Sequence, residues 1–137
     1  MDNEDYLKQH LRKLLGAVGG MVSFGEFMRE TGLPDFQHDP AAHHLLMIEK
    51  LEAVERGDLK QLMFLMPPGS AKSTYASIWF PLYYCARHES ATILCASETI
   101  TLAEKFSSTR RDSALTDAYK LIASHLGAKQ SVQAPTN

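Results

Sequence analysis

The sequence predicts an α/β fold in which an incomplete parallel sheet follows an N-terminal helical segment. Three observations lead to this prediction. Apolar residues recur at helical spacing in the first part of the chain, two short continuous apolar runs follow, and a helix-forming stretch separates those runs. A strand, a helix and a second strand in that order form a parallel pair with a right-handed crossover. Because two strands alone do not make a stable parallel sheet, the predicted sheet is incomplete.

The composition is that of an ordinary globular domain. The chain has 137 residues, of which 45% are hydrophobic and 22% are charged. A net charge of −2 gives no overall electrostatic signature of nucleic-acid binding. The N-terminal residues lack the pattern of a signal peptide, and no apolar run is long enough to span a membrane, so we expect an intracellular protein. The two cysteines, Cys85 and Cys95, lie in apolar surroundings and are expected to be buried free thiols.

The N-terminal helical segment, residues 1–58, is predicted to begin with two helices. The first covers residues 5–18, where leucines and a valine follow the 3.6-residue period. The second opens at Ser23, because Glu26 three residues later completes a capping-box pattern. It is predicted to end near Gly32, and a turn follows over residues 33–36.

A third helix is predicted from Pro40 to Glu55. Asp39 is its expected N-cap, Pro40 is a favourable first helical residue, and Gly57 follows its end. The stripe expected to face the core comprises His44, Met47 or Ile48, Leu51 and Val54.

The second domain, residues 59–113, is predicted to be the start of the sheet. Residues 61–66 and 92–96 are short apolar runs of the kind that form strands buried on both faces. The helix between them is expected to run from Lys72 to about Ala86, with a kink or break at Pro81. Its aromatic residues at helical spacing, expected to pack in the core, are Tyr75, Trp79 and Tyr83.

Two further helices are predicted after the second strand. The first is capped by Ser97 or Thr99 and reaches Asp112, and the second spans residues 115–126. The third region, residues 114–137, contains this last helix and a polar tail.

The segment Met66–Thr74 lies between a predicted strand and a predicted helix, which is the context of a phosphate-binding loop. Backbone N–H groups in such a loop converge on an anion, and the helix N-terminus adds partial positive charge. Lys72 can reach the β- and γ-phosphates of a nucleotide, and the Ser73 hydroxyl can bind Mg²⁺. The full motif has glycine where this chain has Met66 and Ala71. An exposed loop that merely caps a helix is the alternative interpretation.

The predicted ligands of this loop are ATP and Mg²⁺. The residues predicted to bind the nucleotide are Pro68, Gly69, Ser70, Ala71, Lys72, Ser73 and Thr74, and Ser73 is also the predicted metal ligand.

The loop and its flanks resemble the N-terminal ATPase region of the large subunit of tailed-bacteriophage terminases. That family has a variant Walker A motif with two prolines, to which residues 67–74 are similar. Upstream, a Leu-Glu-x-Val-x-x-Gly pattern matches residues 51–57. Downstream, residues 93–97 look like the second core strand of the family. The following helix is similar at Phe106, Ser107, Arg110 and Asp112. The resemblance covers roughly residues 24–112 and implies a P-loop NTPase-like parallel sheet.

The resemblance implies the ATP-binding part of a motor that packages viral double-stranded DNA into procapsids. The implied partners are double-stranded DNA, the portal protein and the small terminase subunit. The implied location is the cytoplasm of a bacterial host, transiently at the procapsid portal. An adenine contact from the segment before the first strand is also implied, and Gln37, His43 and His44 are the alternatives for it.

The sequence departs from this family in ways that leave its catalytic residues unassigned. Many members carry a basic residue in the loop where this chain has Gly69. Glu98 is the nearest acidic residue after a predicted strand, but the resemblance places that segment on a different strand from the family's acidic motif. The family's nuclease domain has no counterpart in these residues, so we expect a truncated subunit that lacks hydrolysis on its own. The other two interpretations are a different P-loop phosphotransferase and a non-catalytic prophage remnant.

Overall fold

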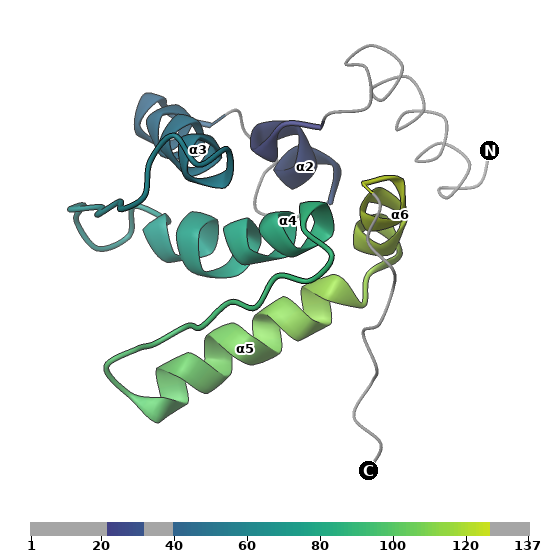
Figure 1. Cartoon of the computed structure of the whole chain (residues 1–137). Coiled ribbons are helices and arrows are strands. Elements are labelled where there is room, and N and C mark those ends of the chain that lie inside the picture. Colours follow the sequence, from purple (N-terminus) through teal and green to yellow (C-terminus); the bar gives the residue numbers. More distant parts are fainter. Residues whose placement is uncertain (1–21, 32–39, 127–137) are drawn as a thin grey trace.

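The computed structural model describes residues 22–31 and 40–126, which form helices packed around one central helical stretch (Figure 1). The elements in chain order are α2 (Phe24–Glu30), α3 (Ala42–Glu55), η2 (Thr74–Trp79), α4 (Phe80–Arg87), α5 (Ile100–Ala114) and α6 (Asp117–His125). In Figure 1, α2 and α3 lie above the stretch formed by η2 and α4, and α5 runs below it. The predicted helix over residues 5–18 and the turn at 33–36 lie outside the described residues, and the division into three regions stays a prediction.

The predicted α/β fold is wrong, because residues 22–31 and 40–126 contain no β-strand. Both predicted strands, residues 61–66 and 92–96, are connections between helices. Along the first, Phe64 and Met66 pack against the core, whereas Leu65 is 88% exposed. Along the second, Leu94 is 94% exposed. The P-loop NTPase-like parallel sheet expected from the resemblance is therefore absent from the described part of the chain.

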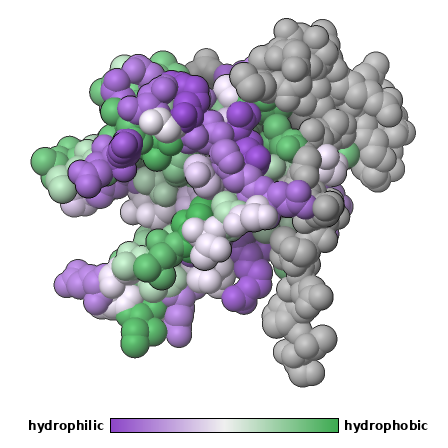
Figure 2. All heavy atoms as spheres, in the orientation of Figure 1, coloured by the Kyte–Doolittle hydropathy of each residue, from purple (hydrophilic) through white to green (hydrophobic). Residues whose placement is uncertain are grey.

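The physical reason for this error is that a strand needs a partner. Apolar composition shows that a segment prefers burial, but the ladder hydrogen bonds and the cover on both faces must come from other segments. Neither run finds such a neighbour among the described residues. Hydrophobic side chains consequently lie on the surface in both segments, residues 61–66 after α3 and residues 92–96 before α5 (Figure 2). Cys95 is exposed for the same reason, whereas Cys85 is half-buried, and both are free thiols.

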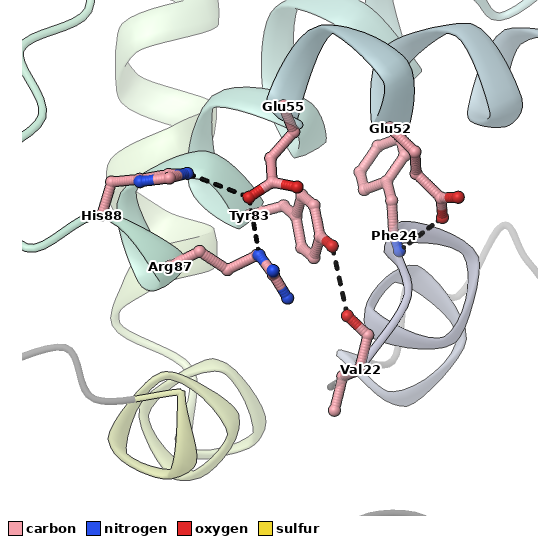
Figure 3. Close-up of polar contacts among 7 residues, drawn as sticks. All are labelled: Val22, Phe24, Glu52, Glu55, Tyr83, Arg87 and His88. Carbon is pink, nitrogen blue, oxygen red and sulfur yellow. Dashed lines mark hydrogen bonds and ion pairs between the residues drawn. The ribbon is translucent and has the colours of Figure 1, made fainter. Parts of the chain in front are cut away.

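The capping box that opens α2 is confirmed. The Ser23 hydroxyl oxygen accepts a hydrogen bond from the Glu26 N–H at 3.2 Å, and the Glu26 carboxylate accepts one from the Ser23 N–H at 3.0 Å. These bonds satisfy N–H groups that have no partner within the helix. The Glu52 carboxylate of α3 adds a third bond at this end, accepting from the Phe24 N–H at 2.8 Å (Figure 3).

Helix α3 begins two residues later than predicted. Its N-cap is Ala41, which has no side-chain oxygen to offer, and Asp39 lies outside the described residues. The C-terminal end is confirmed, since Gly57 follows Arg56 and adopts a φ of +82°, a conformation that a glycine tolerates. Of the predicted inward stripe, three residues are buried (Met47, Ile48 and Leu51), and two are half-buried (His44 and Val54).

Pro81 does not break the helix that contains it. The backbone is helical from residue 72 to 87, but it is wound as a π-helix in η2, where the Phe80 N–H donates to the Tyr75 carbonyl. Proline has no N–H, so the Ser77 carbonyl lacks the donor that an α-helix would supply four residues later. Arg110 of α5 donates to that carbonyl at 2.6 Å. The proline therefore creates an acceptor that fastens α5 to the central stretch.

The aromatic stripe of the central stretch is buried as predicted, at Tyr75, Trp79 and Tyr83. Phe27 of α2 is fully buried and joins this stripe to α6. Its ring centroid lies 6.3 Å from that of Trp79, 5.4 Å from that of Tyr83 and 6.0 Å from that of Tyr119. The Tyr119 hydroxyl donates to the Leu82 carbonyl at 3.3 Å.

Partly buried polar contacts join the end of α4 to α3, and a buried hydroxyl joins α4 to the residues before α2. The Glu55 side chain is only 6% exposed, and its Oε1 atom accepts from Arg87 Nε at 2.8 Å and lies 2.9 Å from His88 Nε2 (Figure 3). Tyr83 donates its hydroxyl to the Val22 carbonyl at 3.2 Å, and burial raises the pKa of Tyr83 to about 12. Such buried charges and hydroxyls stabilise the fold only because each has a partner.

Of the two predicted caps for α5, the structure has Thr99, and α6 has a threonine cap that was not predicted. The Thr99 hydroxyl accepts from the Leu102 N–H at 3.3 Å, and α5 extends to Ala114, two residues past its predicted end. The Thr116 hydroxyl caps α6 by accepting from the Tyr119 N–H. None of the helices in the described part has the length and apolarity needed to cross a membrane.

Replacing Phe27 and Leu94 by alanine tests which of these two side chains is buried in the core and which is exposed to solvent. Phe27→Ala removes a buried ring and is expected to lower the free energy of unfolding by about 3–5 kcal/mol. Leu94→Ala removes an exposed side chain and is expected to change it by less than about 0.5 kcal/mol. Urea unfolding followed by circular dichroism measures both. A loss of about 2 kcal/mol or more in Leu94→Ala would show that residues 92–96 are buried after all.

Candidate phosphate-binding site

The loop before η2 starts with a tight turn. The Ser70 N–H donates to the Pro67 carbonyl at 3.4 Å, and Gly69 has a φ of +80°. Proline at the second position and glycine with positive φ at the third are the marks of a type II turn. A Cβ atom at Gly69 would meet nothing within 4 Å, so the preference for glycine here comes from the backbone conformation alone.

Ala71 holds the least favourable backbone conformation of the loop. Its φ is +55°, and it is the only residue other than glycine with a positive φ among residues 22–31 and 40–126. A left-handed conformation costs an L-residue about 1–2 kcal/mol. This is one of the positions where the full phosphate-loop motif has glycine, so the chain keeps the conformation without the residue that favours it. A left-handed residue followed by a helical one gathers successive N–H groups into a concave, anion-binding arrangement.

The helix that starts at Lys72 leaves N–H groups available to such an anion. The first backbone bond is donated by Tyr75 to the Ala71 carbonyl at 3.1 Å, and η2 has no side-chain cap. The N–H groups of residues 72–74 therefore precede the hydrogen-bonded part of the helix. Together with the peptide dipoles, they make this end of the helix electropositive.

Two side chains of the loop fit an anionic ligand. The Ser70 hydroxyl oxygen is buried and has no hydrogen-bond partner in the described part of the chain. The Lys72 ammonium group forms no ion pair with any described residue. Ser73 and Thr74 are half-buried at the first turn of the helix, and Pro68 and Gly69 are exposed in the turn. The residues predicted to bind a nucleotide thus lie in one continuous loop and helix start.

The alternatives for an adenine contact lie in different surroundings, and which of them contacts adenine stays a prediction. Gln37 lies outside the described residues, and His43 is exposed. His44 lies against the loop, with its Nε2 atom 3.3 Å from the Ser70 carbonyl oxygen. Its ring stacks on that of Tyr75 at a centroid distance of 4.8 Å and an interplanar angle of 18°. This contact was not predictable from the sequence, because it depends on how α3 packs against η2.

Burial is the main cause that lowers the pKa of His44, and the neighbouring charge of His43 lowers it further, while the hydrogen bond to Ser70 opposes both effects. The neutral imidazole is therefore the favoured form near neutral pH. Because a carbonyl oxygen only accepts, the Nε2 atom must be the one that carries the hydrogen.

The other predicted site residues do not join this loop into a metal centre. Glu98 is exposed in the bend before α5. No three His, Cys, Asp or Glu side chains come together as possible metal ligands in the parts of the chain at 22–31 and 40–126. A separate cavity of about 460 Å³ lies between the central stretch, residues 93–97 and α5, and none of residues 68–74 lines it.

Comparisons with protein-family models, with curated proteins and with solved structures found no match for this chain. The resemblance to terminases therefore stays an inference from the loop and its flanking residues.

Exchanging the two small residues of the loop tests its backbone conformation. Gly69→Ala places a Cβ atom on a residue with positive φ, so we expect it to lower the free energy of unfolding by about 1 kcal/mol. Ala71→Gly relieves the left-handed alanine and is expected to raise it by about 0.5–1 kcal/mol. Thermal and urea unfolding measure both variants. Destabilisation by Ala71→Gly would contradict the positive φ at this position.

The lowered pKa of His44 predicts a pH dependence of stability. The unfolded chain takes up a proton at this residue near its ordinary pKa of 6.5, whereas the folded chain resists protonation. The free energy of unfolding therefore falls as the pH decreases through the ordinary pKa of histidine. Well above that pKa, His44 does not make the free energy of unfolding depend on pH. His44→Gln removes this contribution, so its unfolding midpoint is expected to fall less than that of the wild type between pH 7.5 and 5.5. Equal pH dependence of the two proteins would contradict the assignment.

Proposed function

We propose that this chain binds ATP through residues 68–74. The observation that carries the proposal is the left-handed conformation of Ala71, held between a type II turn and the start of a helix. A residue with a Cβ atom disfavours this conformation, and an anion held by the converging N–H groups gains from it. The buried Ser70 hydroxyl and the Lys72 ammonium supply two further donors on the same loop.

Each part of the loop has a distinct role in this proposal. Backbone N–H groups and the helix N-terminus hold the phosphate oxygens, and the Lys72 ammonium neutralises charge on the β- and γ-phosphates. The Ser73 hydroxyl is the side chain that would hold Mg²⁺, which neutralises phosphate charge when bound. The proposal concerns binding, and it assigns no residue to the hydrolysis of ATP.

We further propose that the chain is the ATP-binding part of a motor like the terminase large subunit, which packages viral double-stranded DNA into procapsids. The support is the two-proline loop together with the matching residues before and after it. On this proposal the partners are double-stranded DNA, the portal protein and the small terminase subunit. The setting is the cytoplasm of a bacterial host and, transiently, the procapsid portal. The predicted parallel sheet is no part of this proposal.

Lys72→Ala tests the binding of ATP. A ligand at about 100 times its dissociation constant raises the free energy of unfolding by about 2.7 kcal/mol. Mg-ATP is therefore expected to raise the melting temperature of the wild-type chain by several degrees, and Lys72→Ala is expected to abolish the increase. Differential scanning fluorimetry with increasing Mg-ATP measures both.

Lys105→Ala is the matched control, because it removes an exposed lysine of α5 far from the loop in sequence. It should keep the full response to Mg-ATP. An equal response in Lys72→Ala, or none in a cooperatively folded wild type, would refute ATP binding at this loop. If binding is established, ATP turnover with and without double-stranded DNA separates a packaging motor from another phosphotransferase, and binding without turnover points to a non-catalytic remnant.

A further inference from the structure

His44 reaches the loop from a helix that lies far away in the sequence. Its Nε2–H donates to the Ser70 carbonyl oxygen, 26 residues further along the chain, over 3.3 Å. The stacking of its ring on Tyr75, which is buried, holds the imidazole in place. The contact therefore combines a directed hydrogen bond with an anchored ring.

This hydrogen bond determines where a neighbouring N–H points. The described peptide bonds are all trans, and a trans peptide is planar with its C=O and N–H on opposite sides. Because the Ser70 carbonyl points toward His44, the N–H of Ala71 points away from His44. That N–H belongs to the concave part of the loop, next to the N–H groups of the helix start.

The conformation of Ala71 makes such a hydrogen bond necessary. Rotation of the Ser70–Ala71 peptide plane by about half a turn would change φ of Ala71 from +55° to a negative value, which an alanine prefers. The same rotation would turn the Ser70 carbonyl away from His44 and the Ala71 N–H out of the loop. The strain at Ala71 favours the rotated peptide, and the bond to His44 opposes it.

We propose that His44 is a positioning residue, whose Nε2–H holds the Ser70–Ala71 peptide in the orientation that presents the Ala71 N–H to phosphate. This inference rests on the proposed binding of ATP and identifies what keeps that site in its binding conformation. His44 acts through the backbone of the loop and needs no contact with the nucleotide.

Two substitutions separate the hydrogen bond from the ring. His44→Phe keeps a stacking ring and loses the donor, whereas His44→Gln loses the ring and keeps an amide donor near the position of Nε2. The matched control is Leu46→Ala, because Leu46 lies on the same helix and is 55% exposed. For the full chain, the measurements are the Kd for Mg-ATP and, without nucleotide, the hydrogen exchange of the Ser70 and Tyr75 amides, which donate to the Pro67 and Ala71 carbonyls.

We expect His44→Phe to weaken Mg-ATP binding by about tenfold, the equivalent of one hydrogen bond. His44→Gln and Leu46→Ala should stay within about threefold of the wild type. The Ser70 and Tyr75 amides should exchange faster in His44→Phe alone. A merely structural role for the ring would reverse the order of the two His44 variants, since glutamine has no ring to stack.

Equal affinity in His44→Phe and His44→Gln would overturn the inference, whether both match the wild type or both are weakened. If the wild type does not bind Mg-ATP, the proposed function fails. The hydrogen-exchange measurement alone then decides whether His44 positions the Ser70–Ala71 peptide. Faster exchange in His44→Phe but not in His44→Gln would support positioning, and identical exchange would refute it. Should His44→Phe lose cooperative unfolding, His44→Met replaces it as the variant without a donor.

Discussion

Burial of one face of the central helical stretch is the constraint on which the other features depend. Tyr75, Trp79 and Tyr83 form its inner face, and their rings contact α2 and α3. Phe27 of α2 connects this face to α6 through the ring of Tyr119. The same stretch begins at Lys72, only three residues before the first of these buried rings. The core therefore fixes the direction in which the helix N-terminus, and with it the candidate phosphate-binding loop, faces. Disturbing the aromatic stripe would move the loop as well as loosen the fold.

Features that depend on neighbours in sequence were predictable, and features that depend on distant contacts were not. The caps at Ser23 and Thr99 and the helix end at Gly57 are local, so their residue types were enough to place them. Residues 61–66 and 92–96 have the composition of strands, but a strand exists only with a partner, which composition cannot supply. In the candidate site, the loop was visible from its motif. The contact of His44 with Ser70 was not, because it arises from helix packing.

The apolar side chains that are exposed on the connections between helices have a physical cost. Met63, Leu65 and Leu94 each present most of their apolar side chain to solvent, on segments that have no strand partner in the described part of the chain. Water in contact with such apolar surface loses orientational freedom, and burial of the surface is favourable by roughly 25 cal/mol per Å². Unpaired extended backbone with apolar side chains is also a template on which a second polypeptide can add a strand. Within the described part of the chain, these two segments are therefore prone to self-association.

The position of the single tryptophan gives the molecule a built-in optical reporter. Trp79 is the only residue of its type in the chain, it is 2% exposed, and its indole nitrogen has no hydrogen-bond partner among the described residues. An indole in so apolar a setting emits at shorter wavelength than one in water. All tryptophan fluorescence therefore originates in the aromatic core, on the same helical stretch that begins at the candidate phosphate-binding loop. The wavelength of maximum emission of the unlabelled chain therefore reports whether the aromatic core is packed around Trp79 or exposed to water.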